Sequence, residues 1–199
     1  MAKTIVEEIE YLAGDRIWKT KKTRMEAESR MNRNDLISTL ITNYYTFVVL
    51  AFSIWALILD PTSTQAKNVT LMSVIASVGL FGATLLLSSL GYKGKALQYR
   101  ESYLKLDALE SDVRNLLRNI QFKSQKEVNS EFHALEQKYN EIIALSDNHS
   151  NIDHFKLMID RKLEGSEKLK SSYYFRVVVK YLIVITVFAI PVVLVVIFT

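Results

Sequence analysis

The residues with the most potential for chemistry lie close together near position 150. Asp147, His149, Asp153 and His154 fall within eight residues, and imidazole and carboxylate groups are common zinc ligands. The chain has no cysteine and only one other histidine, His133, so a zinc ligand set would be thin. Turn formation explains Asp147, and a capping box of Ser150 with Asp153 explains the second aspartate, without a ligand. We therefore predict a structural turn at this position and no metal site.

Catalysis is not indicated elsewhere in the chain. A nucleophilic Ser, Thr or Cys needs a base beside it, and the three histidines all fall in or near expected helical turns. No glycine-rich phosphate loop is present. The net charge of +4 is mild and not concentrated in one region, so direct binding of nucleic acid is not expected. We predict a protein that is not an enzyme and that has no catalytic residues and no cofactor.

Three long runs without a charged side chain dominate the sequence: Leu36–Leu59, Asn68–Tyr92 and Tyr181–Thr199. Crossing a hydrocarbon core of about 30 Å takes about 20 helical residues, and backbone in lipid must be hydrogen-bonded internally. The segment between the first two runs is long enough only for a tight turn. The sequence predicts an all-α membrane protein with a transmembrane helical hairpin, a third C-terminal span, and a cytosolic helical hairpin between spans 2 and 3.

The expected organisation has four parts. Cytosolic amphipathic and basic helices occupy residues 1–35, and the transmembrane hairpin occupies 36–92, with spans at about 38–59 and 69–92. A cytosolic helical domain follows over 93–175, and the third span covers 177–199. Lys and Arg precede the first span and follow the second, whereas the turn has only Lys67. Because cations gather on the cytoplasmic side, we predict an inner-membrane protein with a cytoplasmic N-terminus and its C-terminus on the outer side.

The N-terminal region shows two helical patterns. Ile5, Ile9 and Leu12 predict a short amphipathic helix. Gly14 is expected to interrupt it, and Asp15 to cap a second helix rich in Lys and Arg. Such a basic helix ahead of a membrane span either contacts anionic lipid head groups or is solvated, with nearby acidic residues offsetting its charge.

Polar side chains recur along the first two spans at helical spacing. The candidates are Asn43, Thr46, Ser53, Ser73, Ser77, Thr84 and Ser88. They either line a water-filled path in an oligomer or form hydrogen bonds between packed helices. Gly79 and Ala83 form a small-xxx-small pair that lets helices approach closely. Neither span contains an ionisable residue, which argues against a proton-coupled pump.

Two amphipathic stripes follow the second span, and Ser124 with Glu127 forms a capping box between them. The apolar positions are Leu106, Leu109, Val113, Leu116, Ile120, Phe132, Leu135, Tyr139 and Ile142. The stripes either bury one another in an antiparallel hairpin or dock on another subunit as a coiled coil. We take these positions as the candidate assembly face of the cytosolic domain.

Short motifs on both sides of the hairpin carry a family resemblance. They are Arg16-x-Trp18 with Arg24, Ala27 and Arg30 before the first span, and Asp147-Asn148-His149 followed by Asp153 in the cytosolic part. With the short outer turn, this order resembles the SMODS and SLOG-associating two-transmembrane effector domain (SLATT) family of prokaryotic conflict systems, over most of residues 10–165. The third span is additional to the two that the family name states.

The resemblance implies a membrane effector of phage defence. Its cytosolic part would sense a nucleotide second messenger or a neighbouring defence enzyme, and its membrane part would form a pore. Besides the lipid bilayer, we expect further copies of the chain as partners, because two or three helices cannot enclose a channel. The alternative is a membrane anchor or scaffold that tethers a cytosolic enzyme such as a reverse transcriptase or nucleotidyltransferase.

Overall fold

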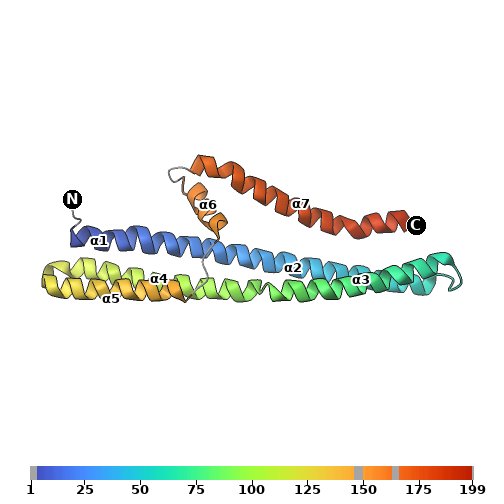
Figure 1. The fold of residues 1–199 in the computed structure, drawn as a ribbon, viewed down its shortest axis with the longest axis horizontal. Coiled ribbons are helices and arrows are strands. Elements are labelled where there is room, and N and C mark those ends of the chain that lie inside the picture. Colours follow the sequence, from blue (N-terminus) through green and yellow to red (C-terminus); the bar gives the residue numbers. More distant parts are fainter. Residues whose placement is uncertain (1–3, 146–149, 163–165, 199) are drawn as a thin grey trace. The chain divides into compact units, whose positions relative to one another are not determined.

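The computed structural model describes residues 4–145, 150–162 and 166–198, and no strand occurs in these ranges. Seven α-helices, one π-helix and one 3-10 helix account for nearly all of them (Figure 1). In chain order they are α1 (Ile5–Tyr11), η1 (Leu12–Ile17), α2 (Trp18–Ile58), α3 (Thr64–Ser89), α4 (Tyr92–Asn119), η2 (Ile120–Phe122), α5 (Gln125–Ala144), α6 (Asn151–Asp160) and α7 (Ser166–Phe198).

The chain divides into two compact units. The amphipathic unit comprises Met1–Asn32 and Lys93–Lys170, and the apolar unit comprises Arg33–Tyr92 and Ser171–Thr199. Helix α2 contributes its first part to the amphipathic unit and the rest to the apolar unit, and α7 is divided in the same way. Each unit is described by itself below.

The expected interruption at Gly14 is wrong. The helix widens into the π-helix η1 and continues directly into α2, so Asp15 caps nothing and instead pairs with Lys19 at 2.5 Å. A π-helix adds a residue to the turn and so shifts the phase of the apolar face. Leu12, Ala13 and Ile17 are all buried as a result. That burial offsets the modest helix cost of glycine.

Two helices of the amphipathic unit form the antiparallel hairpin that their stripes predict. The turn between α4 and α5 contains η2, and Ser124 and Glu127 make the expected capping box. The stripes are buried against one another and against α1 and η1, which the sequence pattern did not place. The buried core is Ile9, Leu12, Ala13, Ile17, Leu106, Leu109, Val113, Leu116, Val128, Phe132, Tyr139 and Ile142, with Ile120 and Leu135 packed partly buried at its edge.

This packing changes the role expected for the two stripes. Leu106, Leu109 and Val113 are fully buried within one chain, so their apolar surface is not available to another subunit. In the structure the stripes therefore form a core within one chain and not a face for assembly with other chains.

The apolar unit begins with the hairpin of α2 and α3. The turn between these helices is held by Asp60, whose carboxylate accepts hydrogen bonds from the Thr62 amide at 2.9 Å and the Thr62 hydroxyl at 2.8 Å. These bonds lower the pKa of Asp60. Ser63 caps α3 by accepting a hydrogen bond from the Ala66 amide at 3.1 Å. At the other end of α3, Gly91 adopts a φ of 60°, which ends the helix.

The third apolar helix is fixed to α2 at a proline. Pro191 lies inside α7 and is buried. Because proline has no N–H, the carbonyl of Val187 loses its usual intrahelical donor. Tyr45 supplies the replacement, donating from its hydroxyl to the Val187 carbonyl at 2.6 Å, and Tyr44 donates to the Phe188 carbonyl at 3.0 Å.

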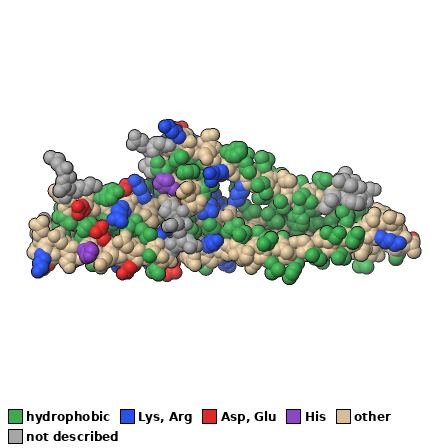
Figure 2. All heavy atoms as spheres, viewed as in Figure 1, with side chains coloured by type: hydrophobic (Ala, Val, Ile, Leu, Met, Phe, Trp, Pro, Cys, Tyr) green, Lys and Arg blue, Asp and Glu red, His purple; other side chains and the backbone are tan. Residues whose placement is uncertain are grey.

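The surface of the apolar unit is covered by hydrophobic side chains (Figure 2). Five large apolar side chains each expose about two thirds of their surface or more: Phe47, Leu57, Phe81, Leu86 and Phe175. Three helical stretches, Ile5–Ile58, Thr64–Phe122 and Ser166–Val193, contain windows long and apolar enough to cross a membrane, and only 0%, 11% and 6% of those windows is buried. Such continuous apolar exposure is suited to lipid and not to water. The protein is an all-α membrane protein.

Candidate functional site

We call the candidate polar side chains of the first two spans the polar seam, and one pair of them meets between α2 and α3. The Ser53 and Ser73 hydroxyls are hydrogen-bonded across the hairpin at 2.8 Å. At about 100° of rotation per residue, Ser77, Thr84 and Ser88 fall within about 60° of Ser73 around α3. On α2, Thr46 and Asn43 fall within about 80° of Ser53. On each helix the sequence-predicted candidates therefore lie within about a quarter of a turn of the serine pair.

The side chains of the polar seam are in contact across the hairpin at one point and are exposed at another. Ser73 is buried in its contact with Ser53, whereas Asn43 and Thr84 are exposed. With helices antiparallel and a rise of about 1.5 Å per residue, Asn43 and Thr84 lie at nearly the same height, about 15 Å along the hairpin from the serine pair. The packing interpretation of the polar residues thus fits Ser53 and Ser73, and leaves the Asn43 end unexplained.

Most hydroxyls of the seam are satisfied within their own helix. Thr46, Ser53, Ser77 and Thr84 each donate to the carbonyl four residues earlier, at 2.7–2.9 Å. The Asn43 amide differs, because it forms no hydrogen bond within the described part of the chain. The amide group of Asn43 is not satisfied by such a bond within its own helix. Leaving an amide unpaired in hydrocarbon costs on the order of several kcal/mol. Asn43 is therefore the seam residue that most needs water or another chain.

The arginines of the N-terminal motif contact other residues of the same chain within the amphipathic unit. Arg30 grips Asp153 with two hydrogen bonds, Nε to Oδ1 at 2.7 Å and Nη2 to Oδ2 at 2.9 Å. Asp153 is 2% exposed and also accepts from the Ser150 amide at 3.1 Å, closing the expected capping box of α6. The two halves of the motif, separated by 123 positions, thus meet in one buried ion pair.

The other N-terminal motif residues have similar roles. Arg16 donates to Glu136 at 3.2 Å and lies 4.8 Å above the Tyr139 ring. The Arg161 guanidinium lies over the Trp18 ring, 5.8 Å from the ring centroid. Arg24 is 2% exposed and donates to the Ser102 hydroxyl. Asp147, Asn148 and His149 lie outside the described residues.

A further ion pair was not foreseen from the sequence. Lys21 donates to Glu110 at 2.5 Å and to Asp107 at 2.8 Å, and Arg114 also holds Glu110 at 2.7 Å. Burial alone would lower the pKa of Lys21, but its hydrogen bonds outweigh burial and raise it. Burial would likewise raise the pKa of Glu110, but the bonds from Lys21 and Arg114 lower it. The available signal was an acid directly beside Leu109 on the apolar stripe.

These pairs bear on the two interpretations of the basic helix. Four cations contact α4, α5 and α6 and so hold the amphipathic unit together: Arg16, Lys21, Arg24 and Arg30. Neither of the two interpretations, lipid contact or solvation, included this role. No three His, Cys, Asp or Glu side chains in the described residues lie close enough to hold a metal ion.

Comparison with known proteins adds one finding. The family model described as SMODS and SLOG-associating 2TM effector domain family 5 matches residues 5–198. No curated protein and no solved structure matches the chain. The matched range includes the motif arginines, the hairpin of α2 and α3, and α7.

Proposed function

Because the chain belongs to SMODS and SLOG-associating 2TM effector domain family 5, a family of membrane effectors of conflict systems, we propose that it oligomerises into a pore in the inner membrane. The amphipathic unit receives the activating signal, a cytosolic nucleotide or a neighbouring defence enzyme. The protein performs no chemical reaction in this scheme, and its effect is to depolarise the membrane of the host cell.

The observation that carries the proposal is the open end of the polar seam. Asn43 exposes an amide with no hydrogen bond in the described residues, at the height of the exposed Thr84 hydroxyl. A second copy of the chain, or water held between copies, supplies partners that lipid cannot. Gly79 and Gly82 leave room for close approach, since a Cβ built on either meets no atom within 4 Å.

The test is to express the chain with its neighbouring genes, trigger the system and follow membrane potential. We expect depolarisation with the natural sequence. Asn43→Leu and Thr84→Val should reduce it at least tenfold, because they make the open end of the seam apolar. Ser89→Ala is the matched control: it removes an exposed hydroxyl about 160° around α3 from Ser73 and should depolarise like the natural chain.

The alternative function, an anchor that tethers a cytosolic enzyme, gives the opposite pattern. Cells would die on triggering with an unchanged membrane potential, and Asn43→Leu would leave the killing intact. That result would overturn the pore.

A further inference from the structure

One buried cation of the amphipathic unit has no negatively charged partner within the described residues. Arg24 is 2% exposed, yet no ion pair joins it to a carboxylate within the described residues. Its Nη1 donates to the Ser102 hydroxyl and lies 3.5 Å from the Ile142 carbonyl oxygen. Its Nε is buried without any hydrogen-bond partner. Both contacts of the guanidinium are to uncharged groups.

The neighbouring cations on the same helix show that this is unusual for the molecule. Lys21 has two carboxylates, and Arg30 has the buried carboxylate of Asp153. Burying a charge without a counter-charge is unfavourable, and burial accordingly lowers the pKa of Arg24. Of the buried or half-buried cations of α2 that face α4, α5 and α6, Lys21 and Arg30 thus have carboxylate partners and Arg24 has none within the described residues.

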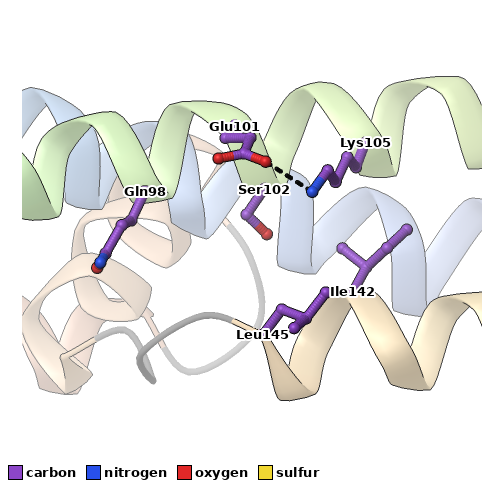
Figure 3. Close-up of a pocket in the computed structure, with 6 residues that line it drawn as sticks. All are labelled: Gln98, Glu101, Ser102, Lys105, Ile142 and Leu145. Carbon is purple, nitrogen blue, oxygen red and sulfur yellow. Dashed lines mark ion pairs between the residues drawn. The ribbon is translucent and has the colours of Figure 1, made fainter.

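A cavity of about 190 Å³ lies beside residues that Arg24 contacts, although Arg24 itself does not line it. Ser102 and Ile142, the two residues that Arg24 contacts, both line it. Figure 3 shows Ser102 in its wall between the Glu101–Lys105 ion pair and the two apolar residues of α5's end. The remaining lining residues are Gln98, Glu101, Lys105 and Leu145.

Lys105 and Ser102 in the wall of this cavity, and Arg24 behind Ser102, are donors of the kinds that bind phosphate, and the Glu101 carboxylate in the same wall is paired with Lys105. A guanidinium presents its N–H groups in a fixed fork that matches the oxygens of a phosphate. The Ser102 hydroxyl, which now accepts from Arg24, can rotate and donate to an anion instead. Lys105 stands at the mouth as a second cation, held 2.6 Å from Glu101.

We propose that the cavity bounded by Ser102, Lys105 and Ile142 binds a small phosphorylated molecule from the cytosol, whose phosphate pairs with Arg24. This rests on the proposed function, because the site is then where the activating signal is received. Helix α2 carries both Arg24 and Asn43 in one unbroken stretch, Trp18–Ile58. An anion that binds Arg24 therefore contacts the same helix that carries Asn43 and the rest of the α2 part of the polar seam.

The test uses the full chain, purified in detergent, with pyrophosphate and inorganic phosphate as probes. Binding is followed by calorimetry and by the shift of the thermal unfolding midpoint, which rises with ligand when only the folded state binds. Sodium chloride and sodium acetate at equal ionic strength serve as reference salts. We expect a saturable rise with pyrophosphate that neither reference salt reproduces.

Three variants locate the site. Arg24→Met should abolish the pyrophosphate response and, without ligand, should raise the unfolding midpoint, because it removes an unpaired buried charge. Arg24→Lys keeps the charge but loses the fork, and should bind at least tenfold more weakly. Arg100→Met, which removes an exposed arginine of α4, should bind like the natural chain.

Several results would overturn the proposal. They are no saturable response to either phosphate probe, an equal response in Arg24→Met, or an equal response to acetate. Repeating the titration in nanodiscs separates the two sources of phosphate. If phosphatidylglycerol discs, unlike phosphatidylcholine discs, prevent pyrophosphate binding, the site takes a lipid head group and the cytosolic ligand is wrong. Failure here leaves the depolarisation test standing, since that test does not use the probes.

Discussion

At the scale of single residues, the amphipathic unit depends on a few ion pairs whose geometry differs from that of ordinary surface pairs. Arg30 and Asp153 meet through two parallel hydrogen bonds, and the carboxylate is almost completely buried. Lys21 and Glu110 have side chains only 13% and 10% exposed. Exposed pairs such as Glu101 with Lys105 contribute little by comparison. The first two predictions separate these classes.

Arg30→Lys should lower the free energy of unfolding by about 1–2 kcal/mol, because lysine keeps the charge but cannot form the two-bond fork on Asp153. Denaturant unfolding of the purified protein measures the change. Arg118→Lys is the control, since Arg118 is exposed and makes only a 3.5 Å bond to Asn115. Equal effects of the two substitutions would show that the fork does not matter.

Glu110→Gln should destabilise the protein by about 2 kcal/mol at pH 7, because two cations lose their shared carboxylate. The pKa of Glu110 is lowered in the folded state. Its contribution is therefore complete above its unfolded pKa of about 4.3 and is lost as the pH falls through the lower folded value.

The measurement for Glu110 is the unfolding free energy of both proteins from pH 7 to pH 3. The difference between them should shrink across the acid end of that range. A difference that stays constant down to pH 3 would contradict the cause given. Glu101→Gln, in an exposed pair, should show little difference at any pH.

At the scale of elements, local signals predicted most of what the structure contains. The capping boxes at Ser124 and Ser150 involve residues three positions apart, and the uncharged runs need no partner to be recognised. What the sequence could not supply were contacts such as Arg24 with Ser102, 78 positions away, because no local pattern encodes them. Gly14 was misjudged for a related reason: tertiary burial of its neighbours outweighs its own weak helix propensity.

Two glycines, one inside η1 and one at the end of α3, should respond in opposite directions. Gly14→Ala should raise the free energy of unfolding by about 0.5–1 kcal/mol, because the position is helical and a Cβ there meets no atom within 4 Å. Gly91→Ala should lower it by about 1 kcal/mol, because its φ of 60° is strained for alanine. Thermal unfolding of the two variants beside the natural chain decides this, and a loss of stability in Gly14→Ala would mean that η1 requires glycine.

The tyrosine at the α7 proline gives a prediction that only a double mutant can test. Tyr45→Phe should cost about 1 kcal/mol, since it leaves the Val187 carbonyl without a donor in an apolar setting. Pro191→Ala restores an N–H four residues after Val187. In that background Tyr45→Phe should cost much less.

Unfolding in mixed detergent micelles provides the four free energies of this cycle. An interaction energy near zero would mean that the tyrosine hydroxyl does not replace the missing proline donor. Tyr44→Phe is a useful comparison, because its bond to the Phe188 carbonyl does not depend on the absent N–H.

At the scale of the whole molecule, the helices that are long enough to span a membrane also carry the residues of the amphipathic unit. Helix α2 holds the paired cations in its first part and Asn43 in its second. Binding energy delivered to Arg24 is thus delivered to a spanning helix. The paired cations and Asn43 therefore belong to one unbroken helix, Trp18–Ile58.

The orientation of the chain is the last property that can be tested directly, and the absence of native cysteine makes the test clean. Gln65→Cys places one thiol in an exposed position beside the outer turn, and Asn129→Cys places one in an exposed position on α5. Because Lys and Arg flank the spans on the side away from that turn, a maleimide that cannot cross membranes should label the first variant in intact cells. It should label the second only after the inner membrane is permeabilised. The reverse pattern would invert the topology, and the amphipathic unit would then face away from any cytosolic signal.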